Sequence, residues 1–264
     1  MLSFRVKMSA AELAIAISTT LFVSMLAALE IGYRLGRRQI EEHPTAHEGI
    51  GAIEAAIFAL LGLLLGFSFS GATARLDARR LLIIGEANAI SSAYLRLDEL
   101  PAPDQPEMRH LFHEYVDARL DAYARIPDMK AFYRGVARAG ELQQQIWTRA
   151  VAASRDDPTQ NSARLLLPAL NEMIDNTTSR TIAIDAHLPG LVFSLLVWVA
   201  LSSGLVAGYA MAKRRKRSWL HMVLYAACIA VTVYTVTDLD YPRSGLIRLS
   251  SADKALQELR DSIR

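Results

Sequence analysis

The sequence predicts an all-α membrane protein with four transmembrane helices and a helical soluble domain, the second transmembrane helix continuing into the soluble part. Three observations support this class. Hydrophobic residues make up 52% of the 264 residues and the mean hydropathy is +0.19, while 21% charged residues leave room for a water-exposed part. Four apolar stretches reach the roughly 20 residues that a spanning helix requires. Between them, apolar residues recur at helical spacing, and no strand-like alternation competes.

The apolar stretches form two pairs, each joined by a short polar or basic segment that would lie outside the lipid. The four stretches are Leu13–Tyr33, Gly51–Gly71, Pro189–Ala212 and Leu220–Thr237. The joining segments are residues 34–48, with Pro44 as a helix breaker, and Lys213–Arg217. This pattern predicts a first transmembrane hairpin over residues 1–72, a helical soluble domain over 73–187, a second hairpin over 188–240 and a tail over 241–264.

The first stretch is interpreted as a retained helix, although Arg5 and Lys7 before it are also typical of a signal peptide. Glu12 interrupts its start, and the apolar part is as long as a full span. Three arginines, which would stop transfer through the membrane, follow it: Arg34, Arg37 and Arg38.

The second stretch organises the chain, because its helical pattern does not stop where the apolar composition stops. Arg75 begins a polar segment, after which an apolar ladder resumes at Ile83, Ala87, Ile90, Tyr94 and Leu97. This spacing is typical of a helix with a narrow packing seam. No proline separates the two halves, and only Gly71 and Gly85 weaken the helix. We therefore expect one helix, partly in lipid and partly in water.

The soluble domain is expected to consist of further helices separated by prolines. Pro101, Pro103 and Pro106 would end the long helix, because a residue before proline avoids the α conformation. Helices are expected over Pro106–Arg125, from the end of the turn Ile126–Asp128 to about Ser154, over Asn161–Ala186, and in the tail from about Ser251. The predicted inward residues are Phe112, Val116, Leu120 and Tyr123, then Phe132, Val136, Ala139, Ile146 and Ala150.

Basic residues flank the spans on both sides, so they favour an orientation only slightly. The Lys213–Arg217 block and the arginines after the first span favour cytoplasmic hairpins. Arg5, Lys7 and the arginines between Arg75 and Arg80 oppose this orientation. Charge alone therefore favours an extracytoplasmic soluble domain.

Small residues recur at every fourth position in two spans. Gly62, Gly66 and Ser70 lie in the second span, and Gly204 and Gly208 lie in the third. Such strips let another helix approach closely in lipid, so we assign these glycines to helix packing.

Several polar residues in or beside the spans are candidates for ion binding or gating. Glu54 lies inside the second span without a local partner, and it either has a function or reaches water at the interface. Glu30 is expected to pair with Arg34 one turn later. Asp238 and Asp240 close the fourth span, and a solvated helix end is favoured over an ion site or pore mouth. Cys228, the only cysteine, is expected to be a buried structural thiol.

No pattern indicates an active site, so neither an enzyme nor a cofactor is expected. His110 and His113 share a helix face beside Glu114, but the zinc-protease signature spaces its histidines at i and i+4 with the glutamate between them. A solvated face is favoured there and no metal site is expected. A net charge of +2 is too small to imply a nucleic-acid partner.

Short motifs along nearly the whole chain carry a resemblance to known membrane proteins. Leu61-Gly-Leu-Leu-Leu-Gly-Phe67, Ala72, Arg75 and Asp77-Ala-Arg-Arg-Leu81 look like the second-helix region of bacterial bestrophin channels. The second half resembles the bestrophin-like group through Leu170-Asn-Glu-Met-Ile-Asp175, Arg180, His187-Leu-Pro189 and Asp240-x-Pro242-x-x-Gly245.

Bestrophins are pentameric ion channels whose second helix lines a narrow apolar neck and whose soluble domain is cytoplasmic. The resemblance implies a neck face at Phe67, Leu63 and Ala59, with Ser70 also lining the pore, and a gate that closes by dewetting. It implies a homo-oligomer, a pentamer if the likeness extends that far, with inorganic ions and the bilayer of a bacterial inner membrane as partners.

The sequence leaves three hypotheses. The first is an oligomeric four-span protein that conducts ions. The second is a membrane-anchored helical sensor or scaffold that conducts nothing, whose soluble helices bind a partner. The third and weakest is a metal-dependent enzyme that uses His110 and His113.

Overall fold

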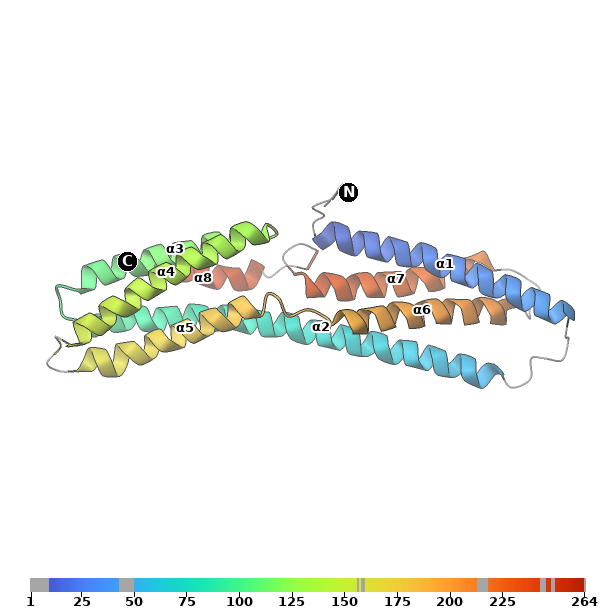
Figure 1. Ribbon diagram of the computed structural model, residues 1–264, viewed down its shortest axis with the longest axis horizontal. Helices are drawn as coiled ribbons and strands as arrows, with labels where there is room; N and C mark the ends of the chain where they lie inside the picture. The colour runs from blue at the N-terminus through green and yellow to red at the C-terminus, as the bar shows by residue number, and fades with distance from the viewer. Residues whose placement is uncertain are drawn as a thin grey trace, which may run out of the picture. The chain divides into compact units, whose positions relative to one another are not determined.

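A computed structural model describes residues 10–42, 50–155, 157, 160–212, 218–242, 246–247 and 250–263. This part of the chain is helical and contains no β-strand (Figure 1). Its helices, in order, are α1 (Ala10–Glu42), α2 (Ile50–Leu95), the 3₁₀ turn η1 (Arg96–Glu99), α3 (Gln105–Ala124), α4 (Met129–Arg155), the π turn η2 (Ser162–Leu166), α5 (Leu167–Ile182), α6 (Gly190–Met211), α7 (Trp219–Asp240) and α8 (Ser250–Ser262). The predicted all-α class is confirmed.

The chain forms two compact units that share α2. The first contains the described residues up to Arg75 together with His187–Tyr241. The second contains Leu76–Ala186 and the described residues from Pro242 onward. The second span is therefore part of a helix that leaves one unit and enters the other, as the apolar ladder predicted.

In the described part of the chain, four helices are long and apolar enough to cross a membrane: α1, α2, α6 and α7. The first unit contains α1, α6, α7 and the part of α2 up to Arg75. Their shared core is formed by Leu21, Met25 and Leu29 of α1, Leu61 of α2, Leu196, Val199 and Ala200 of α6, and Met222, Ala226, Ile229 and Val233 of α7. Most of each apolar span is left uncovered by the chain, as expected for helices whose other faces meet lipid or protein.

Two expectations about this unit were wrong. Helix α1 continues to Glu42 and includes much of the segment assigned to a polar hairpin. Arg37 pairs with Glu41 at 3.3 Å across one turn of this extension. Pro44 lies outside the described residues. Cys228 is exposed on α7, because an apolar span does not reveal from sequence which of its faces packs. The predicted Arg34–Glu30 pair is confirmed at 2.7 Å.

Helix α2 is continuous over 46 residues, and its predicted packing seam is buried throughout. Ile83, Ala87, Ile90, Tyr94 and Leu97 are each no more than 6% exposed. The helix ends slightly before the prolines, where η1 tightens the chain into a 3₁₀ turn.

The second unit packs α3, α4, α5 and α8 against the later part of α2 (Figure 1). The inward faces predicted for α3 and α4 are confirmed, with Leu120 and Val136 only partly buried. The predicted fourth helix begins as a π turn at Ser162. At this start, the Asp157 carboxylate accepts hydrogen bonds from the backbone N–H of Ser162 at 2.9 Å and from its hydroxyl at 2.6 Å. The tail helix α8 buries Leu256, Leu259 and Ile263 in the same core.

Candidate functional site

One side of α2 is exposed from Ala59 to Leu95. Its exposed residues recur every three or four positions as far as Asn88, and Leu95 follows seven positions later, after the partly buried Ser91. This spacing places them on one side of a helix of 3.6 residues per turn. We call this set the exposed face of α2; it consists of Ala59, Leu63, Phe67, Ser70, Ala74, Asp77, Leu81, Ile84, Asn88 and Leu95. The four residues expected to line a pore, from Ala59 to Ser70, are all members, and Phe67 is 68% exposed.

The two glycine strips have different surroundings. A methyl group on Gly208 would lie 1.9 Å from the carbonyl oxygen of Leu29, and one on Gly204 would meet Met25 at 3.4 Å. These glycines therefore lie where α6 approaches α1. A methyl group on Gly62 or Gly66 would meet nothing within 4 Å. The α2 strip is open within one chain.

Helix α1 contributes its own close approach to α6, which the sequence analysis missed. A methyl group on Gly32 would lie 1.9 Å from the carbonyl oxygen of Leu205, and one on Gly36 would meet Tyr209 and Ala212 at 2.8 Å. The spacing Gly32-x3-Gly36 was a usable signal, since small residues four apart are typical of close helix contacts in lipid.

The two aspartates that end α7 are buried, so the interpretation of a solvated helix end was wrong. Asp238 is 3% exposed and Asp240 is 4% exposed. Asp240 accepts hydrogen bonds from Arg75 Nε at 2.7 Å and from the backbone N–H of Leu188 at 2.7 Å. Next to it, His187 stacks on Tyr241 with ring centroids 4.4 Å apart. Sequence alone could not show this, because Arg75 is 165 residues from its partner.

Four polar atoms of α2 are buried without a hydrogen-bond partner among the described residues. Two belong to the apolar part of the helix: Glu54 Oε1, near its start, and the hydroxyl of Ser68, one residue after Phe67. The other two are Arg75 Nη2 and Arg80 Nε. Glu54 therefore stays a candidate for ion binding or gating.

Where α2 turns polar, its arginines and its aspartate face different ways. Arg79 is 8% exposed and donates to the backbone oxygens of Ala183 at 3.1 Å and Ala186 at 2.7 Å. Arg80 donates to Asp77 at 3.2 Å across the helix surface. Asp77 itself lies on the exposed face, with 58% of its side chain accessible.

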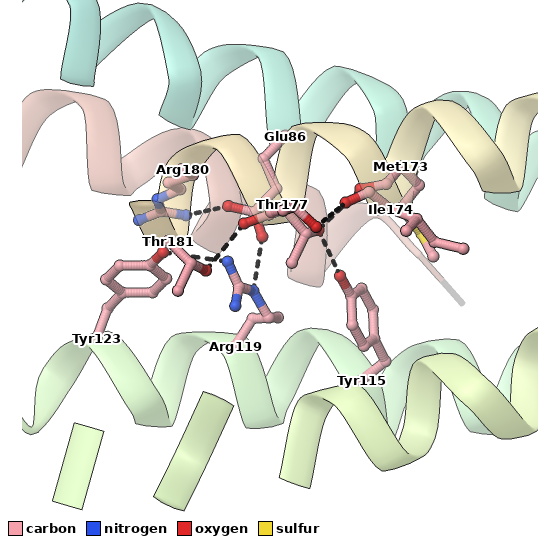
Figure 2. A network of polar contacts seen from close by, with 10 residues as sticks. Glu86, Tyr115, Arg119, Tyr123, Met173, Ile174, Thr177, Arg180 and Thr181 are labelled. Atoms are coloured by element: carbon pink, nitrogen blue, oxygen red, sulfur yellow. Dashed lines mark hydrogen bonds and ion pairs between the residues drawn. The ribbon is translucent and has the colours of Figure 1, made fainter. Parts of the chain in front are cut away.

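The second unit contains a buried ionic network that the sequence analysis missed (Figure 2). The Glu86 carboxylate accepts from Arg119 Nε at 2.6 Å and from Arg180 Nη1 at 2.5 Å. The guanidinium of Arg180 also lies 3.7 Å from the ring centroid of Tyr123. The network joins α2, α3 and α5. Arg180 was noted only for its family resemblance, and spacing gave no other signal because its partner is 94 residues away.

Burial and charge together shift the pKa values of this network. Burial alone would lower the pKa of Arg119, but the Glu86 carboxylate beside it outweighs burial and raises that pKa. Tyr115, which hydrogen-bonds Thr177 at 2.8 Å, has its pKa raised from 10.0 to about 12, chiefly by burial. Both groups therefore keep their protons at neutral pH.

The two histidines considered for a metal site, His110 and His113, do not lie in a cluster of metal-ligating side chains among the described residues. His110 is exposed and pairs with Glu114 at 3.4 Å, while His113 packs edge-on against Tyr94. Among the described residues, no three His, Cys, Asp or Glu side chains are grouped to hold a metal ion.

Comparison with known families now identifies the chain's family. The sequence matches the model of the bestrophin-like domain over residues 8–253. The chain belongs to the bestrophin-like family. A search of curated proteins gave no match. Among solved structures, the bestrophin-like chain resembles a crystal structure described as a membrane protein, with a TM-score of 0.65 and 12% identity, covering 91% of this chain and 98% of the other. That likeness concerns the fold.

Proposed function

We propose that this bestrophin-like protein is a homo-oligomeric ion channel of a bacterial inner membrane, in which copies of α2 surround a pore. The observation that carries the proposal is the exposed face of α2. It is mainly apolar after the charged segment from Arg75 to Arg80, with Leu81 68%, Ile84 44% and Leu95 67% exposed and Asn88 as the polar member.

The exposed apolar residues after Arg80 indicate whether this face of α2 contacts lipid or protein. Exposed apolar residues within a span are expected wherever a helix meets lipid. Outside the lipid they would be exposed to water, which is unfavourable by about 25 cal/mol per Å² of apolar surface. A protein neighbour accounts for both parts of the face. Since the same helix carries both, other copies of α2 are the simplest neighbour.

A pore surrounded by this face would have an apolar neck. Leu63 and Phe67 are one turn apart, and both side chains are more than half exposed. Rings of such side chains form a constriction that can exclude water and so stop ions. The open strip at Gly62 and Gly66 lies beside Phe67 and would let neighbouring helices approach.

The test is to record currents from the purified protein in planar bilayers and to measure the mass of the detergent-solubilised assembly. We expect an oligomer, with five copies if the likeness to bestrophins extends to assembly. Phe67→Ala and Leu63→Ala should raise the conductance or the open probability, because a smaller ring is easier to wet. Phe69→Ala is the matched control, since Phe69 is 46% exposed on another face of the same helix.

The alternative is a membrane-anchored helical sensor or scaffold. It predicts an assembly that carries no current and tolerates changes at Phe67. A monomer would contradict both the shared pore and the protein neighbour inferred for α2.

A further inference from the structure

The segment of α2 that follows the proposed neck looks basic in sequence. Arg75, Arg79 and Arg80 accompany a single acidic residue, Asp77. A pore mouth with this composition would attract anions if all four side chains faced the pore.

The structure directs two of these three arginines away from the exposed face. Arg75 forms an ion pair with Asp240 at 2.7 Å, and 23% of its side chain is accessible. Arg79 is 8% exposed and its guanidinium donates to the backbone oxygens of Ala183 and Ala186. Their charges are therefore engaged with groups on the packed side of α2.

Asp77 faces the opposite way. It follows Ser70 by two helical turns and Phe67 by ten residues, about 15 Å along the helix axis. It is the one charged member of the exposed face, and 58% of its side chain is accessible. Arg80 lies about 60° round the helix from Asp77 and pairs with it at 3.2 Å. It is less exposed, at 43%, and its buried Nε has no hydrogen-bond partner among the described residues.

We propose that Asp77 makes the pore selective for inorganic cations over anions; this rests on the function proposed above. If α2 lines the pore, symmetry repeats Asp77 in every copy and forms a ring of carboxylates ten residues further along α2 than Phe67. Rings of Asp or Glu are how cation channels concentrate their ions. Arg80, at the flank of the ring, partly offsets its field.

The experiment measures the reversal potential of single channels across a KCl gradient in planar bilayers. The unaltered protein should reverse near the potassium equilibrium potential. Asp77→Asn should lower the K⁺/Cl⁻ permeability ratio by about tenfold, the lower end of the enrichment that a charged cleft produces. Arg80→Gln should raise the ratio, because it removes the opposing charge. Asp121→Asn is the matched control, because Asp121 also forms an exposed local ion pair, with Arg125 at 2.7 Å, but lies on α3; it should leave the ratio unchanged.

The outcomes separate this inference from the proposed function. Currents that prefer chloride, or a ratio that Asp77→Asn leaves unchanged, would overturn the role of Asp77 and leave the channel intact. A protein that assembles and reconstitutes but carries no current would overturn the channel, and the selectivity with it.

Discussion

At the scale of single residues, the second unit depends on one carboxylate held between two guanidinium groups. Glu86 and Arg119 are both completely buried, and Arg180 is 4% exposed. Removing one partner of a buried ion pair leaves an uncompensated charge in a medium of low dielectric constant. The network therefore ties α3 and α5 to α2, because Arg119 and Arg180 share the one carboxylate of Glu86.

Glu86→Gln should lower the free energy of unfolding by about 3–5 kcal/mol, because it leaves Arg119 and Arg180 buried without a counter-charge. Chemical denaturation in detergent, followed by circular dichroism, measures this. The matched variant replaces the three residues together, Glu86→Leu with Arg119→Met and Arg180→Met. It should recover most of the loss, since an apolar triad of similar volume avoids the desolvation cost. If Glu86→Gln unfolds like the unaltered protein, the network contributes little to stability.

Tyr115 should make the protein sensitive to alkali. Its pKa is about 12 in the folded chain and near 10 when unfolded, so folding favours the protonated phenol. This contribution is complete below pH 10 and is lost as pH rises from about 10 to about 12, by about 3 kcal/mol in total. Phenylalanine cannot ionise, so the free energy of unfolding of Tyr115→Phe should fall less between about pH 10 and about pH 12 than that of the unaltered protein. Identical alkaline profiles for the two proteins would contradict it.

At the scale of helices, burial separates glycines that look equivalent in sequence. Gly208→Ala should destabilise the first unit by about 1–3 kcal/mol, because the new methyl group would meet the backbone of Leu29. Gly62→Ala, on the open strip of α2, should leave the melting temperature of a single chain unchanged or slightly higher. Thermal melting of detergent-solubilised protein compares the two. If Gly62→Ala instead reduces the mass of the assembly, the strip packs against another copy.

Helix positions were predictable because period and breakers are local properties of the chain. The spacing of the ladder from Ile83 to Leu97 indicated both a helix and its buried side. Within the spans the same reasoning failed. A span is apolar all round, so no period shows which face packs, and the exposure of Cys228 could not be foreseen.

The polar contacts were predictable only over one helical turn. The Arg34–Glu30 pair followed from spacing, whereas the partners of Arg75, Glu86 and Arg180 come from distant segments. The charge pattern after the second span was correspondingly misleading, because it did not show which arginines turn inward. Selectivity could not be inferred until those partners were known.

At the scale of the whole molecule, the exposed face of α2 ties assembly to residues outside the lipid. Leu81→Lys and Leu95→Lys should each reduce the assembly to smaller species, because a cation would replace an apolar contact at the centre of the interface. Mass measurement in detergent gives the result. Leu165→Lys is the control, as Leu165 is similarly apolar and 44% exposed but lies on η2. Assemblies of unchanged mass would show that water, and not another copy, covers this part of α2.

The exposed thiol on α7 offers a direct way to count the copies. The chain contains one cysteine, which a single chain leaves exposed on a span, where it faces lipid or another copy. If it faces lipid, a membrane-permeant maleimide dye that enters the detergent micelle would attach once per chain without any engineered residue. Under continuous illumination of isolated particles, the number of bleaching steps in each fluorescence trace would equal the number of subunits.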